Sequence, residues 1–340
     1  MKTKKRKTIR FGNKVIGTNK HIYIIAEAAN NHGGNFGTAK KMIVAAAEAG
    51  ADAVKFQCFY ADSFAVKNHP YYKVYKSLEF TKKQWIELLD TAKKQNIDFI
   101  VDVNDEKSVD LMDSIGVRMF KIHTGDVMNP FFLDYVAKKN KPMILHLGLV
   151  EMDDLREALA TINKAGNDKA ILMLGFQDYP TKPEHLNLSI LKTLEKEFDC
   201  VLGFADHTTG ITASIAGVAI GAVVLEKHFS LDRSKKDYDW ESAIEPPLFK
   251  KLVKEIRTME KMFGRGELTL TETQKKYIPA MMKHIVAKND IKAGEIITLK
   301  KLAFKRSPNG LFPKEANKIV GKKAKKKIMA DEEITLGKVK

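Results

Sequence analysis

The segment VVLEKHFSLDR, residues 223–233, begins with β-branched and aliphatic residues and then places three ionisable groups in succession, Glu226, Lys227 and His228. A short apolar run of this kind is typical of a buried β-strand. Runs of the same type precede it, each separated from the next by room for one helix: residues 21–29, 53–59, 98–104, 117–124, 142–149, 170–176 and 200–208. The alternation predicts repeated βα units on a parallel sheet.

The number of these units favours one fold class. Eight βα units in about 240 residues match the size of a (β/α)8 TIM barrel, whereas a doubly wound open sheet usually has fewer strands. The first βα turn also lacks the G-x-G-x-x-G pattern of a dinucleotide-binding sheet. We therefore expect an α/β protein built on a TIM barrel.

The pattern changes after the last helical segment of the barrel, near EIRTMEKMFG. The rest of the chain contains short apolar runs broken by the turn sequences KAGE and SPNG. A module of this size buries little apolar surface by itself, so we expect it to pack against the barrel or against a second chain. The predicted organisation is a basic N-terminal extension at 1–20, a barrel domain at 21–263, a linker at 264–282 and a small C-terminal domain at 283–340.

The formal net charge of +16 is concentrated at the two ends of the chain. Residues 1–20 carry eight Lys or Arg and no acid, and residues 283–340 carry sixteen Lys or Arg against six acids. Stacking aromatics do not interleave the basic run GKKAKKKI, so a solvated face or a patch that steers an anionic substrate is favoured over nucleic-acid binding. No apolar stretch has the length of a membrane span, and no secretory signal is apparent, which predicts a cytoplasmic protein. Cys58 and Cys200 are too few for a disulfide framework.

All eight expected strands end in polar residues, where a TIM barrel carries its chemistry. Glu226 and His228 are two positions apart and share one face of their strand, and His207 has the corresponding place on the preceding strand. Two imidazoles from neighbouring strand ends are a candidate pair of ligands for a divalent metal, the alternative for each being a satisfied core histidine.

Lys55 and Lys121 each interrupt an apolar strand, where an unpaired ammonium group would be costly. One interpretation is a buried salt bridge with Glu27 or Asp126. A second is an anion site in which both lysines hold a phosphate or carboxylate. A third is a lysine that forms a Schiff base. Two lysines beside a candidate metal pair favour the anion site.

Several segments together resemble a known family: IAEAANNHGG, AAAEAGADAVKFQ, FKIHTGD, YPTKPEHLNL, GFADHT, LEKHF and FKRSPNG. In this order they resemble the sialic acid synthase family, which includes the legionaminic, pseudaminic and spore-coat sugar synthases. The resemblance implies a TIM barrel followed by a small antifreeze-like (SAF, β-clip-like) domain. It also implies a transferase that condenses phosphoenolpyruvate with an N-acetylhexosamine, such as N-acetylmannosamine or a derivative, to a nine-carbon 2-keto sugar acid with release of phosphate.

The resemblance also assigns roles to individual residues. His207 and His228 match metal ligands, for manganese, magnesium or cobalt. It implies a homodimer with exchanged C-terminal domains, in which Arg306 reaches the active site of the partner subunit. The residues expected at the reacting centre are Glu27, Asp126, Lys55 and Lys121, and those expected to bind substrate are Thr124, His146, Gln177, Tyr179, Glu226, Asp239 and Arg306.

The sequence departs from the family pattern around the expected phosphate site. Asp102 follows the third strand where the family has hydroxyl residues, His146 and Ala205 each replace a serine, and Asp126 shortens a glutamate. KKDYD replaces PGPD before Asp239. One hypothesis is that His123 and His146 act as cations in the anion site and that Asp102 pairs with one of them. The competing hypothesis is that the protein still binds its metal but no longer binds phosphoenolpyruvate as its donor substrate.

Three other functions are alternatives to this one. A related synthase of the DAHP or KDO8P kind lacks the appended domain, and a non-catalytic carbohydrate-binding protein would not need Glu27, Lys55, Lys121, His207 and His228 together. Nucleic-acid binding through the basic ends is the third alternative. Tyr71, Tyr72 and Tyr75, in the loop after the second strand, either line the substrate pocket or pack a lid.

Overall fold

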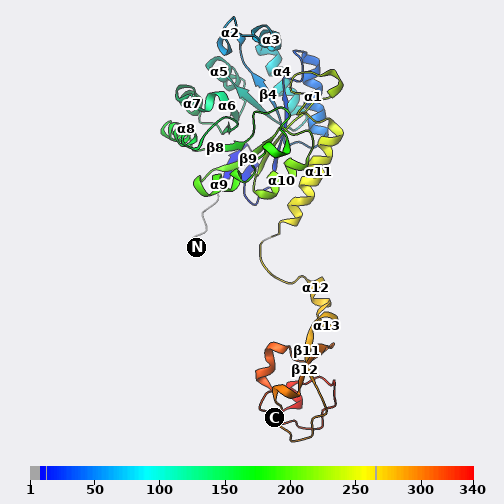
Figure 1. Ribbon diagram of the computed structural model, residues 1–340. Helices are drawn as coiled ribbons and strands as arrows, with labels where there is room; N and C mark the ends of the chain where they lie inside the picture. The colour runs from blue at the N-terminus through cyan, green and yellow to red at the C-terminus, as the bar shows by residue number, and fades with distance from the viewer. Residues whose placement is uncertain (1–7, 13, 265) are drawn as a thin grey trace. The chain divides into compact units, whose positions relative to one another are not determined.

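The computed structural model describes residues 8–12, 14–264 and 266–340 of the chain (Figure 1). The chain divides at Gly264 and Arg265 into two compact units. We call them the barrel unit and the C-terminal unit, and each is described by itself. No helix among the described residues is both long enough and apolar enough to cross a membrane.

Eight parallel strands close into a barrel in chain order, with β10 beside β3. This confirms the predicted fold class. The strands are β3 (Tyr23–Ala29), β4 (Ala53–Cys58), β5 (Asp98–Val103), β6 (Phe120–Ile122), β7 (Met143–His146), β8 (Ala170–Leu174), β9 (Val201–Asp206) and β10 (Val224–His228).

Helices pack around the barrel and cover its outer surface (Figure 1). The longer ones are α1 (Phe36–Glu48), α4 (Lys82–Lys94), α5 (Glu106–Ser114), α7 (Pro130–Ala137), α8 (Met152–Lys164), α9 (Ile190–Glu197), α10 (Thr212–Ile220) and α11 (Pro246–Met262). Short helices interrupt the loops: α2 (Ala61–Phe64), α3 (Tyr72–Leu78), α6 (Thr124–Val127), η1 (Pro183–His185) and η2 (Arg233–Lys235). Helix α4 begins at the predicted capping box, in which Thr81 and Gln84 satisfy each other's backbone groups.

The alternation of side chains along each strand separates two layers of the core. In β4, Val54 and Phe56 face outward into the cluster shared with the helices, whereas Ala53 faces inward among the residues that fill the barrel. Lys55 lies between Val54 and Phe56 and therefore faces inward, one layer above Ala53. The interior is thus apolar at the amino end of the strands and ionisable at the carboxyl end.

The basic N-terminal region contains a structured hairpin that the sequence analysis did not predict. Strands β1 (Thr8–Phe11) and β2 (Lys14–Gly17) pair antiparallel, with Ile9, Phe11 and Ile16 buried. They join the apolar cluster inside the barrel, where the Phe11 ring meets the Tyr23 ring edge-on at 6.1 Å. Arg10 separates the buried Ile9 and Phe11, and Lys14 begins β2, so the high charge of this region concealed a strand pattern.

The C-terminal unit has a hydrophobic core of its own, which includes Ile285, Ile297 and Ile328. It begins with α12 (Glu272–Lys276) and α13 (Ile278–Met281), inside the segment predicted as a linker, and continues with β11 (Lys283–Ala287) and β12 (Leu302–Arg306). These strands pair antiparallel. The short helices η3 (Leu299–Lys301), η4 (Pro313–Lys318) and η5 (Leu336–Lys338) complete the unit.

Candidate active site

A cavity of about 340 Å³ opens at the carboxyl end of the barrel strands. Its polar lining comes from all eight strands or from the loops that follow them, as the strand-end pattern predicted. Most of the predicted site residues line this cavity: Glu27, Lys55, Lys121, His146, Gln177, Tyr179, His207, Glu226, His228 and Asp239.

Both lysines are buried in a cluster of carboxylates. Lys55 Nζ lies 2.8 Å from Asp102 Oδ2 and 3.7 Å from Glu226 Oε2, and it also contacts Glu27. Lys121 Nζ lies 2.5 Å from Glu226 Oε1. The salt bridge predicted with Glu27 is therefore confirmed for Lys55, whereas Lys121 pairs with Glu226, and both lysines also line the cavity.

The protonation of this cluster follows from burial and charge. Burial raises the pKa of Glu27 to about 8, against the opposing effect of Lys55. Burial acts to lower the pKa of Lys55, but the three carboxylates outweigh it and hold that pKa well above its usual range. Lys55 is therefore a permanent cation, which argues against the Schiff-base interpretation because that chemistry needs a neutral amine. Glu27 Oε1 and Asp102 Oδ1 have no hydrogen-bond partner among the described residues, so both can meet a ligand.

The expected partner of Asp102 is corrected by this geometry. Asp102 bonds to Lys55 and not to a histidine, because the fixed charge of the ammonium group on the neighbouring strand attracts it more strongly. Burial also lowers the pKa of His123 and His146. The hypothesis that these two histidines are cations is therefore wrong for this arrangement of charges.

His146 fits its position because glycines surround it. A Cβ atom added at Gly175 would collide with the imidazole ring, and one at Gly148 would lie 2.8 Å from it. The His123 and His146 rings lie nearly parallel with centroids 6.1 Å apart, and His207 follows at 5.7 Å from His146. Three strand ends thus carry a row of imidazoles along one side of the cavity.

The rings of His207 and His228 meet edge-on, with centroids 5.1 Å apart and an interplanar angle of 65°. His207 Nδ1 donates to the Phe176 carbonyl at 2.6 Å, which leaves Nε2 as the nitrogen that carries a lone pair. Burial lowers the pKa of His207 to about 4 and that of His228 well below its usual range, so both rings are neutral. Nδ1 of His228 has no hydrogen-bond partner among the described residues. Neutral imidazoles, one of them oriented through a backbone carbonyl, are the donors that a divalent metal requires. Among the described residues, no group of three or more His, Cys, Asp or Glu side chains is arranged to hold a metal ion.

Tyr179 and Gln177 lie next to this pair. The Tyr179 ring stacks on His207 with centroids 4.4 Å apart, and its hydroxyl donates to Gln177 Oε1 at 2.8 Å. Asp239 also lines the cavity, and burial raises its pKa to about 6. These side chains surround the space next to the two imidazoles.

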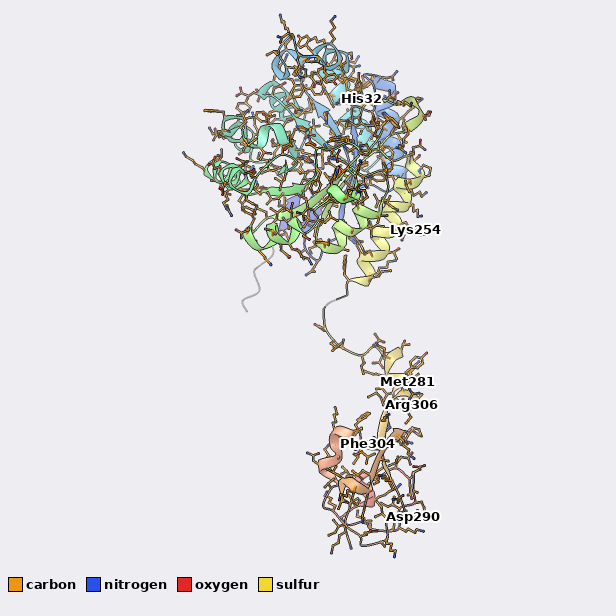
Figure 2. The ribbon with its side chains drawn as sticks, in the orientation of Figure 1. His32, Lys254, Met281, Asp290, Phe304 and Arg306 are labelled. Atoms are coloured by element: carbon orange, nitrogen blue, oxygen red, sulfur yellow. The ribbon has the colours of Figure 1, made fainter. Side chains whose placement is uncertain are left out.

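Two predicted site residues, Thr124 and Asp126, are not part of the cavity. The Thr124 hydroxyl accepts from the Leu149 amide at 2.9 Å, and Asp126 accepts from Asn129 at 3.2 Å, because both belong to α6, which turns away after β6. Arg306 ends strand β12 in the C-terminal unit (Figure 2). His32, also labelled in Figure 2, packs against Phe80 at 4.7 Å and does not line the cavity.

The apolar side of the cavity was foreseen from the sequence only as one of two alternatives for Tyr71, Tyr72 and Tyr75. Tyr71 and Tyr75 line it, whereas Tyr72 bonds to Asp62 outside it. Asp102 and His123, which were predicted at the anion site, also line the cavity. The lining residues without a predicted role are Asn30, Gln57, Phe59, Phe64, Val74, Leu78, Asn104 and Tyr238. The many aromatic residues in the loop after the second strand are the sequence feature from which the apolar lining residues could have been predicted.

The fold and the cavity define a TIM-barrel enzyme whose site combines buried lysines, carboxylates and a pair of neutral histidines. The model of the NeuB family matches residues 42–268, and that of the SAF domain matches residues 284–340. The chain belongs to the NeuB family.

Relatives named as synthases cover nearly the whole chain. The N,N'-diacetyllegionaminic acid synthase of Campylobacter jejuni is 37% identical, over 92% of this chain and 98% of its own length. The human N-acetylneuraminate-9-phosphate synthase is 33% identical, over 94% of this chain and 93% of its own. A crystal structure of N-acetylneuraminic acid synthetase from Leptospira borgpetersenii in complex with citrate is 32% identical, with a TM-score of 0.77, over 81% of this chain and 96% of that one.

Proposed function

We propose that this protein condenses phosphoenolpyruvate with an N-acetylated hexosamine, forming a nine-carbon 2-keto sugar acid and releasing phosphate. The observation that carries the proposal is that Lys55, Lys121, His207 and His228 all line one cavity. The names of the relatives support the same reaction class. A non-catalytic carbohydrate-binding protein would gain nothing from these buried charges, which are costly to maintain.

The two lysines bind phosphoenolpyruvate in this proposal. Their ammonium groups are held inside the cavity by Glu27, Asp102 and Glu226 and stay charged there. They would turn toward the phosphate and carboxylate groups of the substrate as point charges. The carboxylate of Asp102 would repel the phosphate group and so weaken the binding of phosphoenolpyruvate.

His207 and His228 would hold a divalent metal, with manganese, magnesium and cobalt as candidates. When bound there, the metal supplies Lewis-acid polarisation of the open-chain sugar aldehyde. Tyr179, stacked on His207, and Gln177 would orient the sugar beside it. His146, Glu226 and Asp239 complete the proposed substrate contacts.

The chemistry joins the methylene carbon of phosphoenolpyruvate to the aldehyde carbon of the sugar, which leaves a cationic enol carbon. Water adds to that carbon, and phosphate then leaves by cleavage of the C–O bond. Glu27 would accept the proton from the water, because its pKa of about 8 lets the carboxyl exchange protons near neutral pH. Lys55 and Lys121 would hold the charge of the departing phosphate.

The remaining predictions belong to this proposal as well. Arg306 would reach the active site of a partner subunit in a homodimer with exchanged C-terminal domains and fix the acyl group of the sugar. Thr124 and Asp126, which lie outside the cavity here, would act only through a rearrangement of α6. The reaction would take place in the cytoplasm.

A phosphate-release assay with phosphoenolpyruvate, manganese and a panel of hexosamines tests the proposal. Lys55→Met should abolish release, whereas Lys82→Met, an exposed lysine at the start of α4, should leave it unchanged. No release with any hexosamine, from protein that binds manganese, would refute the proposed reaction.

A further inference from the structure

One side of the cavity is apolar, and a single stretch of chain supplies it. Residues 59–78, between β4 and α4, contribute Phe59, Phe64, Tyr71, Val74, Tyr75 and Leu78 to the lining. We call these six residues the aromatic wall. The buried lysines, carboxylates and histidines are on the barrel strands, so the cavity has a charged part and an apolar part.

The aromatic wall is ordered by contacts among its own rings. Phe59 and Phe64 stack with centroids 5.1 Å apart, and Tyr75 meets Phe64 edge-on at 5.0 Å. The Tyr60 amide donates to Asp105 Oδ2 at 3.1 Å, which ties the segment to the loop after β5. The Ala61 amide donates to Glu79 Oε1 at 2.8 Å and so joins the two ends of the segment. A wall held in this way offers a preformed apolar surface, which lowers the entropic cost of binding.

The charges around the cavity are unfavourable to an additional anion. Its described lining contains four carboxyl groups, those of Glu27, Asp102, Glu226 and Asp239, against the ammonium groups of Lys55 and Lys121. In the proposed function both lysines are occupied by phosphoenolpyruvate. Arg306 of the partner subunit is occupied there by the acyl group, so a phosphate on the acceptor sugar would meet carboxylates and aromatic rings in this lining.

The lysines of residues 59–78 do not change this balance. Lys67 and Lys73 are exposed and are not among the residues that line the cavity. Lys76 is paired with Glu79 at 3.1 Å and with Asp62 at 3.3 Å. The apolar wall thus has no cation of its own directed into the cavity.

We infer that the acceptor is an uncharged N-acylated hexosamine with further apolar groups, such as a second acyl group or a terminal methyl in place of a hydroxyl, and is not a sugar phosphate. The inference rests on the proposed function and names the substrate class of the same site. The aromatic wall receives the methyl groups, because apolar surface removed from water stabilises binding. Phe64 and Tyr71 are then residues that determine specificity.

Three acceptors separate the possibilities: N-acetylmannosamine, its 6-phosphate, and a 2,4-diacetamido-6-deoxy hexose. We expect kcat/KM to be at least about tenfold higher for the diacetamido deoxy sugar than for N-acetylmannosamine, as one apolar group in a fitted pocket can supply this ratio. The 6-phosphate should be the poorest substrate. A preference for the 6-phosphate would overturn the inference while leaving the proposed reaction intact.

Binding measured by calorimetry, without turnover, keeps the two claims distinct. If no acceptor releases phosphate, the proposed reaction fails, and the inference still requires the diacetamido sugar to bind more tightly than the 6-phosphate to the manganese-loaded protein. Equal binding of the two sugars, tighter binding of the 6-phosphate, or no binding of the neutral sugars would overturn it.

A charge placed in the wall gives a second test. Phe64→Arg should lower kcat/KM for the diacetamido sugar and raise the relative rate with the 6-phosphate by about tenfold or more, through a new cation in the lining. Val66→Arg is the matched control, since Val66 is 69% exposed in the same segment and does not line the cavity. The same change in preference in both variants, or in neither, would show that the wall does not select the acceptor.

Discussion

Lys227 Nζ lies 3.3 Å from Asp206 Oδ1 in an ion pair that is completely buried behind the site. Asp206 also accepts from the Thr208 amide at 2.8 Å and from the Ser214 hydroxyl at 2.5 Å. Asp206 precedes His207 and Lys227 precedes His228 in the chain, and in each strand the neighbouring side chain points to the opposite face. The ion pair therefore fixes the two strand ends that carry the proposed metal ligands.

Replacing Lys227 by Met should destabilise the protein by about 3–5 kcal/mol, because the Asp206 carboxylate would stay buried without its counter-charge. Manganese affinity should fall as well, since the two histidines would lose their fixed separation. Urea unfolding and manganese titration measure the two effects. Lys250→Met, in an exposed position of α11, is the control. Unchanged stability of the Lys227 variant would show that the pair does not anchor the strand ends.

His228→Ala should weaken manganese binding at least about tenfold, as the loss of a group that builds a metal site does. Electron paramagnetic resonance of free manganese in the presence of the protein measures this without turnover. His185→Ala serves as the control, since that imidazole is exposed and pairs with Asp178. Equal affinities of the two variants would place the metal elsewhere.

Asp102→Asn should lower the KM for phosphoenolpyruvate by about three- to tenfold, because one negative charge is removed from a site of low dielectric. Lys55 keeps Glu27 as its partner in this variant. Steady-state kinetics measure KM, with Asp153→Asn as a control on an exposed ion pair of little energetic weight. A higher KM would mean that Asp102 serves mainly to position Lys55.

The titration of the Glu27 carboxyl group should make the stability of the protein depend on pH. Its carboxyl binds a proton more tightly in the folded protein, with a pKa of about 8, than in the unfolded chain near 4.5. The contribution of Glu27 to the stability of the fold is therefore fully present below about pH 4.5. It is lost as the pH rises toward 8. Between pH 5 and pH 8 the free energy of unfolding of wild type should fall more than that of Glu27→Gln, by roughly 3–4 kcal/mol. Parallel pH profiles for the two proteins would contradict the raised pKa.

The sequence predicted what depends on local periodicity. Lys55 follows Ala53 by two positions and Glu226 precedes His228 by two, so the period of a strand sufficed to direct these side chains into the barrel mouth. The partner of Asp102 was not predictable in this way, because it depends on which neighbouring strand offers the stronger charge. The aromatic wall depends on how a loop folds over the barrel, and the pairing of β1 with β2 was concealed by their basic residues. Both are set by contacts between distant parts of the chain.

The fate of the bridging oxygen of phosphoenolpyruvate tests the proposed reaction most directly. With a heavy-oxygen label in that position, the account predicts that the label leaves in the released phosphate and that release requires both the hexosamine and the metal. Label retained in pyruvate, or release at the same rate without an acceptor sugar, would contradict the condensation.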